Sequence, residues 1–469
     1  MTAAQLNDVS FSYEGTDKLI LDHASFTLNY GEIALLSGYS GEGKSTILSL
    51  LCSIIPNITP GNLTGSVFIN GEDIAGKKMS EVSRNVAVVM QNAESQIIQS
   101  EVEDEIAFGC ENFNFPVDEI RKCVDDSAKM MALDPLWKTR TLSGGQKQRL
   151  MTAAAFATRQ KILMLDEPLA NLDTAGGELL MRRLRELADT GSAILIIEHR
   201  LDMVLPYADA VWSVTGGKIV PVSDARSQAA PIIDKCRPSS STEVLLSLEN
   251  IGFRASGREI LHDISLDVYK GERLLILGEN GCGKTTLLRL IARLNKSTAG
   301  QITQYIDAGL KQSQRGSREW FRVVGVVYQN PNYQLFMPTV FEEIAYGAPS
   351  NEYAEEILEM FRLQELRDRH PQSLSEGQKR RVSIAAVAAT RPRLLLLDEP
   401  TVGQDRDGLE RLMEILGALH EKTGSTMISV THDKRCALAL CDRAVLIENG
   451  TIKRCGGKDL TREFFNIEK

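Results

Sequence analysis

The chain has 469 residues, a formal net charge of −9 and eight scattered cysteines. Its length exceeds what one hydrophobic core can hold and predicts two domains of over about 200 residues each. The acidic balance argues against a nucleic-acid-binding protein, and the lack of a C-x-x-C pair argues against a zinc or iron–sulfur site.

The chain is not expected to cross a membrane by itself. Its first residues show no basic segment followed by an apolar block, so we expect no secretory signal. Apolar runs such as residues 394–397 are much shorter than the ~20 residues of a membrane helix.

In chain order, residues from about 5 to 36 come first, and their alternating apolar and polar side chains predict short antiparallel strands. A glycine-rich stretch follows and leads into a predicted helix: Gly38-Tyr39-Ser40-Gly41-Glu42-Gly43-Lys44-Ser45. This order of strand, turn and helix is the context of a phosphate-binding P-loop. Backbone N–H groups would surround the phosphate oxygens, Lys44 would reach the β- and γ-phosphates, and Ser45 would hold Mg²⁺.

Predicted strands and helices then alternate. Residues from about 101 to 140 interleave charged and apolar side chains, which predicts an insert of amphipathic helices. Ser143 and the glycines after it open the next helix, as in an N-terminal anion site. A buried strand ends at Asp166 and Glu167, at the carboxyl end where open parallel sheets bind ligands.

The whole pattern occurs twice. A second glycine-rich stretch, Gly278-Glu279-Asn280-Gly281-Cys282-Gly283-Lys284-Thr285, also follows an apolar run, and Lys284 minus Lys44 is 240 positions. A polar segment with prolines and a run of serines, at about 223–242, predicts a linker. The sequence therefore predicts a first domain at 1–222 and a second at 243–469.

The two halves share motifs in one fixed order: P-loop, glutamine, Leu-Ser-x-Gly-Gln, Asp-Glu-Pro, aspartate and histidine. In the first half these are the P-loop to Lys44, Gln91, Leu142–Gln146, Asp166–Pro168, Asp173 and His199. In the second half they are the P-loop to Lys284, Gln329, Leu374–Gln378, Asp398–Pro400, Asp405 and His432. Both halves therefore resemble nucleotide-binding domains of ABC-type ATPases. The resemblance implies an α/β fold of two tandem P-loop NTPase domains, each with a mostly parallel core sheet, an antiparallel β subdomain and a helical insert.

The resemblance also implies the cofactors ATP and Mg²⁺ and a role for each motif. The glutamates would orient or deprotonate the attacking water and the histidines would contact the γ-phosphate, so the catalytic set is Glu167, His199, Glu399 and His432. The Mg²⁺ shell would come from Ser45, Gln91, Asp166, Thr285, Gln329 and Asp398. Nucleotide contacts would come from Tyr13, Gly38, Ser40, Gly41, Gly43, Lys44, Ser45, Thr46, Ser143, Gly145, Gly278, Asn280, Gly281, Gly283, Lys284, Thr285, Thr286, Ser375 and Gly377. Tyr13 could stack on adenine or pack on the core as a strand aromatic, and its position leaves both open.

The family further implies a head-to-tail pairing of the two halves, with each ATP between one P-loop and the opposite serine–glycine helix. Two departures from symmetry predict unequal sites. The Lys44 site would face Glu376, which replaces a glycine; its carboxylate would repel the triphosphate, and a positive φ there would add strain. The Lys284 site has Ala255 near the position where Tyr13 would fall. Stacking on the adenine base would therefore be lost there unless Phe253 substitutes. We expect slow turnover at the Lys44 site and most hydrolysis at the Lys284 site.

The segments after the glutamines indicate a class of ABC protein. Residues 328–336, Tyr-Gln-Asn-Pro-Asn-Tyr-Gln-Leu-Phe, and 339–347 are similar to energy-coupling-factor (ECF) ATPases, which drive uptake of vitamins or of nickel and cobalt. Gln96, Gln334 and the stretch 197–201 fit the same group. The resemblance implies a transmembrane coupling subunit, docked beside helices at about 101–131 and 340–362, and a membrane subunit that binds the small-molecule cargo.

The alternative is a twin-cassette ABC ATPase that acts on ribosomes or nucleic acid. The translation-factor type usually adds a long, charged helical linker, whereas the segment 223–242 is short and contains prolines. Repair types add zinc modules or coiled coils, and neither is visible in the sequence. We therefore expect no nucleic-acid partner and a peripheral position at the cytoplasmic face of the cell membrane.

Overall fold

The computed structural model describes residues 1–16, 18–38, 41–170, 172–222, 241–255, 257–306 and 316–467. They form two compact units, here called unit one and unit two, and each is described by itself. The predicted linker at 223–242 lies outside the described residues except for its last two positions. Within the described ranges, every helix is too short or too polar to cross a membrane.

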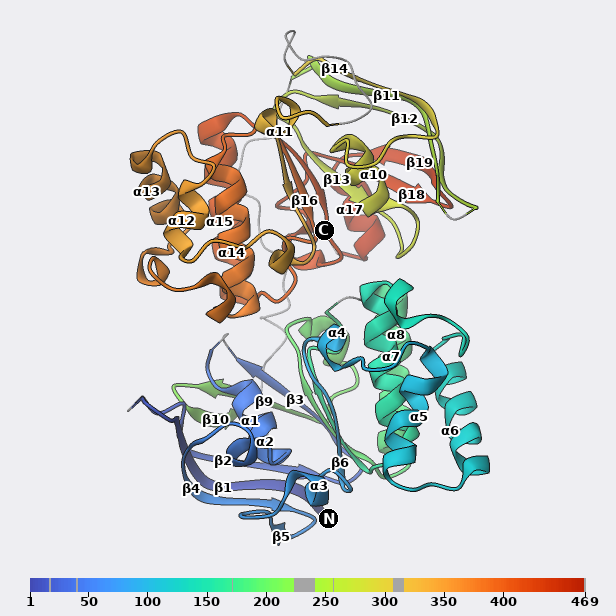
Figure 1. Cartoon of the computed structure of the whole chain (residues 1–469), viewed down its shortest axis with the longest axis vertical. Coiled ribbons are helices and arrows are strands. Elements are labelled where there is room, and N and C mark those ends of the chain that lie inside the picture. The colour runs from blue at the N-terminus through green and yellow to red at the C-terminus, as the bar shows by residue number, and fades with distance from the viewer. Residues whose placement is uncertain are drawn as a thin grey trace. The chain divides into compact units, whose positions relative to one another are not determined.

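Unit one contains two sheets and a group of helices (Figure 1). Its strands are β1 (Thr2–Tyr13), β2 (Leu21–Asn29), β3 (Ile33–Gly38), β4 (Gly61–Ile69), β5 (Glu72–Asp73), β6 (Val86–Val89), β7 (Ile162–Asp166), β8 (Ala193–Ile197), β9 (Ala210–Thr215) and β10 (Lys218–Pro221). Its helices are α1 (Lys44–Leu51), α2 (Ile54–Asn57), α3 (Met79–Val82), α4 (Ala93–Gln96), α5 (Val102–Asn112), α6 (Val117–Met130), η1 (Thr139–Thr141), α7 (Gly144–Ala157), α8 (Thr174–Asp189) and α9 (Leu201–Val204).

The sheets of unit one divide as the sequence predicts. The antiparallel sheet has the order β2-β1-β4-β5, and the second sheet has the order β10-β9-β3-β8-β7-β6. In the second sheet all neighbours pair in parallel except β10 with β9. Every residue of β7 and of β8 is buried, because helices and the antiparallel sheet cover both faces. The predicted amphipathic insert forms as α5 and α6, beside α7 in Figure 1.

Unit two repeats this architecture. Its strands are β11 (Val244–Ala255), β12 (Arg258–Tyr269), β13 (Arg273–Leu277), β14 (Ala299–Gln304), β15 (Val324–Val327), β16 (Leu394–Asp398), β17 (Thr426–Val430), β18 (Arg443–Glu448) and β19 (Thr451–Gly456). Its helices are α10 (Lys284–Ile291), α11 (Trp320–Val323), η3 (Pro331–Tyr333), α12 (Val340–Ala345), α13 (Asn351–Met360), η4 (Gln364–Leu366), η5 (Pro371–Ser373), α14 (Glu376–Ala389), α15 (Arg406–Thr423), α16 (Lys434–Ala437) and α17 (Lys458–Phe465).

The sheets of unit two have the orders β12-β11-β14, which is antiparallel, and β15-β16-β17-β13-β18-β19, in which only β18 and β19 pair antiparallel. Helix α17 adds a small apolar cluster against β13 and β18, through Leu460 and Phe465. The predicted fold of two P-loop domains, each with a mostly parallel sheet, an antiparallel part and a helical insert, is therefore confirmed.

The strand order brings the predicted chemistry to one edge of each parallel sheet. In unit one, β8 lies between β3 and β7, so the P-loop after β3, the carboxylates after β7 and the histidine after β8 share the carboxyl edge. In unit two, β17 lies between β13 and β16 and produces the same arrangement.

Candidate active site

Both P-loops have a backbone that only glycine accommodates easily. Gly43 and Gly283, directly before α1 and α10, have φ of 97° and 106°. A Cβ on Gly38 would lie 2.6 Å from the Val214 carbonyl oxygen. A Cβ on Gly278 would lie 2.4 Å from the carbonyl oxygen of Ile447. The glycines therefore keep this turn narrow and its N–H groups accessible to a ligand, as a phosphate cradle requires.

In unit one, the P-loop side chains converge on the end of β7. Lys44 is buried, and its Nζ donates a 2.7 Å hydrogen bond to the Gly38 carbonyl across the loop. The Ser45 Oγ donates to the Asp166 Oδ2 over 2.9 Å. A hydroxyl and a carboxylate oxygen side by side are the ligand types that Mg²⁺ prefers.

Unit two has the same arrangement. Lys284 Nζ donates to the carbonyl oxygens of Gly278 and Glu279, both at 2.7 Å. Thr285 Oγ1 donates to Asp398 Oδ1 over 3.1 Å. In each unit, a lysine and a pair of oxygen ligands thus lie at the start of one helix, as the two P-loop motifs predict.

The second carboxylate of unit one is buried beside a glutamine and a histidine. Glu167 is 8% exposed, and its Oε1 accepts a 2.8 Å hydrogen bond from Gln91 Nε2. His199 Nε2 lies 3.5 Å from the same oxygen. The backbone of Glu167 has φ of 50°, an uncommon conformation for a non-glycine residue and one that clusters at functional sites.

The matching carboxylate of unit two has the same backbone and the same neighbour. Glu399 also has φ of 50°, and its Oε1 lies 3.5 Å from His432 Nε2. The His432 backbone N–H donates to Glu399 Oε2 over 3.1 Å. The Gln329 carbonyl oxygen accepts from the guanidinium of Arg380, which lies on α14.

Burial removes water from around these carboxylates and disfavours their charged form. It raises the pKa of Asp166 to about 6, against the hydrogen bond from Ser45, and raises the pKa of Asp398 as well. The pKa of Glu167 rises to about 8, because of burial first and of the charges of Asp166 and Glu198 second. A cation bound at this edge would relieve the repulsion, so the residues fit a site for a metal ion with a phosphate ligand.

The serine–glycine motifs begin α7 and α14. Ser143 caps α7 and Ser375 caps α14, each by accepting from the backbone N–H three residues on. Gly145 and Gly377 lie in the first turns of these helices, and a Cβ on Gly377 would lie 2.9 Å from the Gly403 carbonyl oxygen. The helix starts therefore have the form of the predicted anion sites.

The condition for strain at Glu376, a positive φ, is not met. The first residue of α14 is Glu376, so its backbone is helical and it is not among the residues with positive φ. Its carboxylate also lies 3.1 Å from Lys379 Nζ, which offsets part of its negative charge. Of the two reasons for slow turnover at the Lys44 site, only the negative charge of Glu376 remains, and the contact with Lys379 reduces it.

The other predicted nucleotide contacts lie on the first strands and around the P-loop turns. The Tyr13 hydroxyl shares a 2.9 Å hydrogen bond with Thr46 Oγ1, and its ring packs edge-on against Phe11, so it lies over the start of α1. Phe253 pairs with Leu261 in unit two, which is the place of Phe11 rather than of Tyr13. Gly41, Asn280, Gly281 and Thr286 lie in or directly after the P-loop turns, and Ser40 lies outside the described residues.

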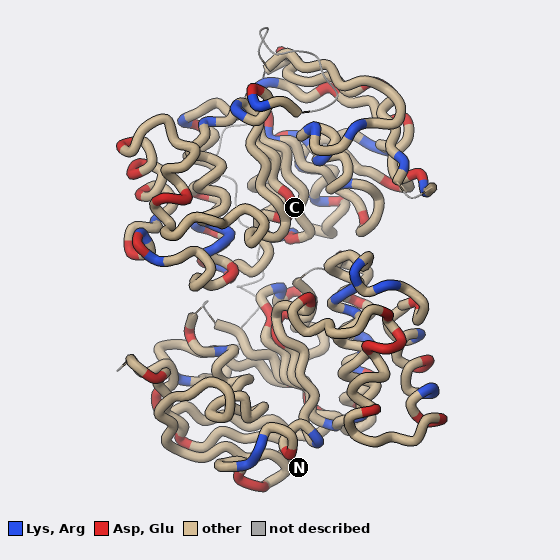
Figure 2. Tube along the Cα trace, in the orientation of Figure 1, with Lys and Arg blue, Asp and Glu red and all other residues tan. Residues whose placement is uncertain are grey.

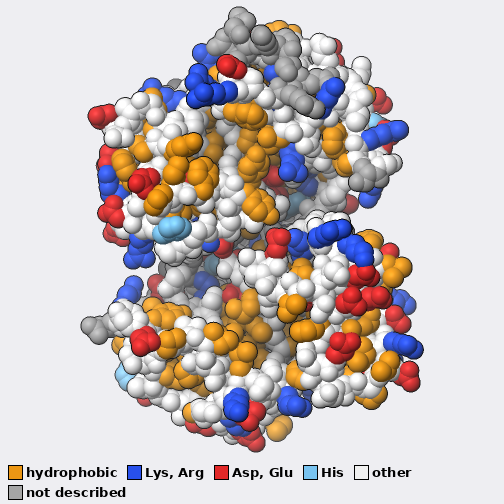
Figure 3. Space-filling model, in the orientation of Figure 1, with side chains coloured by type: hydrophobic (Ala, Val, Ile, Leu, Met, Phe, Trp, Pro, Cys, Tyr) orange, Lys and Arg blue, Asp and Glu red, His pale blue; other side chains and the backbone are white. Residues whose placement is uncertain are grey.

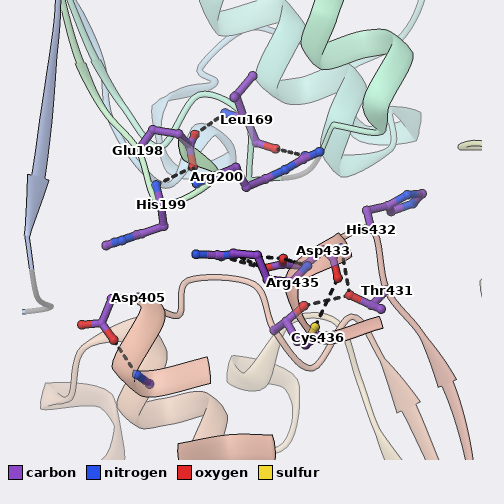
Figure 4. Close-up of polar contacts among 12 residues, drawn as sticks. Leu169, Glu198, His199, Arg200, Asp405, Thr431, His432, Asp433, Arg435 and Cys436 are labelled. Atoms are coloured by element: carbon purple, nitrogen blue, oxygen red, sulfur yellow. Dashed lines mark hydrogen bonds and ion pairs between the residues drawn. The ribbon is translucent and has the colours of Figure 1, made fainter. Parts of the chain in front are cut away.

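Sequence reasoning missed a buried carboxylate next to His199. Glu198 directly follows β8 and is 2% exposed. Its oxygens accept from three backbone N–H groups, those of Leu169, His199 and Arg200 (Figure 4). The signal was present, because an acidic residue at the end of a buried strand is the pattern that identified Asp166 and Glu167.

Comparison with known proteins agrees with this geometry. The family described as "ABC transporter" matches residues 21–170 and 261–402. A relative from Methanosarcina mazei, named "Putative ABC transporter ATP-binding protein", is 32% identical over 96% of this chain and 88% of its own. A relative of the same name from Treponema denticola is 32% identical over 96% of both chains. A solved structure described as "Model of ribosome-bound archaeal Pelota and ABCE1" has a TM-score of 0.72 at 22% identity, over 98% of this chain and 80% of the other.

Two P-loop units with this carboxyl edge define a twin-cassette nucleotide hydrolase. The chain belongs to the ABC transporter family. It is an ATP-hydrolysing enzyme that binds ATP with Mg²⁺. When bound, Mg²⁺ supplies positive charge that neutralises the phosphates, and Ser45 with Asp166 and Thr285 with Asp398 are the groups that would hold it. The likeness to the ribosome-bound protein, at 22% identity, shows the fold alone.

Proposed function

We propose that this ATPase energises an ECF-type importer of a vitamin or a transition-metal ion. It would bind a transmembrane coupling subunit at the cytoplasmic face of the membrane, next to a membrane subunit that recognises the cargo. Within the chain, the two units would pair head to tail around two ATP molecules. In the assigned roles, Glu167 and Glu399 position or deprotonate water, and His199 and His432 contact the γ-phosphate.

The observation that carries this proposal is an exposed aromatic patch next to the glutamine loop of unit two, here called the aromatic patch. It consists of Tyr333, Phe336 and Tyr346, which are 70%, 67% and 72% exposed. The rings of Phe336 and Tyr346 pack edge to face, with centroids 5.9 Å apart. On the face drawn in Figure 3, hydrophobic side chains gather where the helical insert of unit two meets its parallel sheet. Grouped exposed aromatics of this kind mark protein-binding surfaces.

A buried carboxylate fixes the backbone of the loop that carries Phe336 in the aromatic patch. The carboxylate of Glu343, which is 4% exposed, accepts from the backbone N–H groups of Phe336 and Met337, both over 2.8 Å. A buried carboxylate on α12 thus fixes the loop that presents Phe336 to solvent. A rigid exposed aromatic loses little conformational entropy when a partner covers it, which suits a docking anchor.

Unit one has the same device with an aliphatic anchor. Glu105, also buried, accepts from the backbone N–H groups of Ile98 and Gln99 over 2.8 and 2.6 Å. Ile98 is 69% exposed. The two units would therefore contact a membrane subunit through different side chains, each on a loop fixed by a buried glutamate. This fits a partner with two unlike docking helices.

The charge distribution supports a protein partner more than a nucleic acid. Lys and Arg alternate with Asp and Glu along the helices of both units in Figure 2, as on an ordinary protein surface. Nucleic-acid binders instead gather basic residues along one face.

The test is recovery of the full chain with solubilised membranes. We expect Phe336→Ser with Tyr346→Ser to lower co-purification of a multi-span membrane protein about tenfold or more, since interface anchors dominate binding. Tyr305→Ser with Phe321→Ser is the matched control, because these two aromatics are also exposed but lie outside the aromatic patch. ATP binding should stay within about twofold in both variants. Recovery of the wild-type chain with ribosomes and without membrane proteins would contradict the proposal.

A further inference from the structure

In unit one, the loop after Glu167 is joined to the loop that carries His199 (Figure 4). The Glu198 carboxylate makes the first connection. It accepts from the Leu169 N–H over 3.0 Å, and from the N–H groups of His199 and Arg200 over 2.8 and 3.1 Å. One buried side chain therefore binds the backbone of both loops.

Arg200 makes the second connection, in the opposite direction. Its Nη1 donates to the Leu169 carbonyl oxygen over 3.2 Å and to the Leu172 carbonyl oxygen over 2.6 Å. Leu169 is thus held through its N–H by Glu198 and through its carbonyl by Arg200. Leu169 and Leu172 cannot move away from 198–200 without breaking several hydrogen bonds to charged groups.

The corresponding positions of unit two carry different groups. Thr401 follows Glu399-Pro400 as Leu169 follows Glu167-Pro168, and Thr431 precedes His432 as Glu198 precedes His199. The two threonine hydroxyls share one hydrogen bond of 2.9 Å. At the position of Arg200, Asp433 pairs with Arg435 over 2.6 Å. The link between the two loops in unit two is therefore made by neutral hydroxyls where unit one uses charges.

We propose that Glu198 and Arg200 are positioning residues for ATP hydrolysis in unit one. By joining the two loops, they keep Glu167 and His199 in one arrangement, so that a water molecule meets both groups together. A buried carboxylate beside a half-buried guanidinium is a costly way to fill this part of the protein, and apolar residues of similar size stabilise as well. Their geometric effect, and not stability, accounts for their presence beside the reacting groups. The inference depends on the ATPase activity alone and not on the membrane partner.

The experiment uses the full chain with Glu399→Gln, so that hydrolysis reports the site of unit one. Single-turnover hydrolysis with enzyme in excess gives the rate constant of the chemical step, and titration of the enzyme gives the affinity for Mg·ATP. The variants are Glu198→Thr, Arg200→Ala, and Glu198→Thr combined with Leu169→Thr, which installs the hydroxyl pair of unit two. The controls are Glu119→Thr and Arg159→Ala, which break an exposed ion pair in the same unit.

We expect Glu198→Thr and Arg200→Ala each to slow the chemical step about tenfold or more, because small displacements of reacting groups are costly. Affinity for Mg·ATP and the unfolding temperature should change little, and the two controls should stay within about twofold. The Leu169→Thr addition should recover most of the rate. Hydrogen exchange should speed up in the peptide that covers 167–173 and stay unchanged in the one that covers 399–405.

Four outcomes would overturn the proposal. In the first, Glu198→Thr has an unchanged rate. In the second, rate, affinity and unfolding temperature fall together, as a purely structural role requires. In the third, exchange at 167–173 is the same as in the parent chain. In the fourth, the Glu399→Gln chain hydrolyses no ATP.

Discussion

The loop after the paired carboxylates is held by different chemical groups in the two units. In unit one, Glu198 and Arg200 join it to the histidine loop of the same edge. In unit two, Gln404 Nε2 donates over 2.8 Å to the Gly377 carbonyl oxygen, at the start of the serine–glycine helix α14. This loop is therefore held by a charged link to the histidine loop in unit one, and by neutral hydrogen bonds to the histidine loop and to α14 in unit two.

A second contrast concerns the glutamine loops. In unit two, the buried Arg380 donates to the carbonyl oxygens of Tyr328 and Gln329, so α14 holds this loop directly. At the same place in unit one stands Gln148, fully buried, whose side-chain nitrogen and oxygen have no hydrogen-bond partner among the described residues. Movement of the glutamine loop should thus reach α14 more directly in unit two. From these two contrasts we expect two sites that do unequal work.

The largest effect is expected from removing both P-loop lysines, because each unit uses its lysine for the phosphates. Lys44→Ala with Lys284→Ala should weaken Mg·ATP binding about 100-fold or more, because each lysine supplies a cation to phosphates that repel one another. Equilibrium binding of a fluorescent ATP analogue measures this. Lys77→Ala with Lys422→Ala removes two lysines from surface ion pairs and serves as the control. Equal affinity in the two double variants would refute the phosphate role.

A smaller effect is expected from the second glutamine of each loop. These residues face inward: Gln96 Oε1 accepts from the Met90 N–H, and Gln334 bonds to Tyr328, Val326 and Ser383. They would therefore shape the docking loops and not touch the partner. We expect Gln334→Ala to lower membrane co-purification several-fold, and Gln96→Ala less, with ATP binding kept.

The exposed Gln364→Ala is the control for this series. The same loss of co-purification from Gln96→Ala and Gln334→Ala would remove the distinction between the loops. A loss of ATP binding without a loss of co-purification would place both glutamines in the nucleotide site instead.

The smallest effect is a pH dependence of the stability of the protein, caused by the buried carboxylate of Glu167. Burial and nearby carboxylates raise the pKa of Glu167 from 4.5 to about 8, so the folded protein binds a proton that the unfolded chain has lost. Stability without nucleotide or Mg²⁺ should therefore fall as pH rises from 4.5 to 8. Glu167→Gln removes this dependence and should stabilise the protein by about 1–2 kcal/mol more at pH 8 than at pH 6.

Urea unfolding at the two pH values measures this difference, with Glu119→Gln, at an exposed position, as the control. An equal effect of Glu167→Gln at both pH values would show that the carboxylate is ionised throughout.

Much of the fold and site followed from the sequence because the motifs constrain the backbone. The P-loop glycines need conformations that side chains obstruct, and a buried strand that ends in Asp166-Glu167 must deliver both to the ligand edge. Local patterns therefore sufficed to place Lys44 and Ser45 beside Asp166, which the structure brings together.

Other features depend on contacts between distant segments, which one sequence does not reveal. The sequence leaves the backbone conformation of Glu376 open, because it depends on where α14 begins. The sequence places Gln96 and Gln334 in the glutamine loops, but only the curl of these loops shows that both side chains turn inward. The link from Glu198 to Leu169 spans 29 positions and exists only because β7 and β8 are neighbours.

The most direct test of unequal sites compares Glu399→Gln with Glu167→Gln by steady-state ATP turnover in the assembled complex. If the two units pair head to tail as proposed, the site built on Lys284 would face the unaltered Ser143 helix, and the site built on Lys44 would face Glu376. The account predicts that Glu399→Gln removes most of the activity and that Glu167→Gln removes clearly less. Equal losses from the two substitutions would contradict it, because the sites would then alternate strictly or act as one.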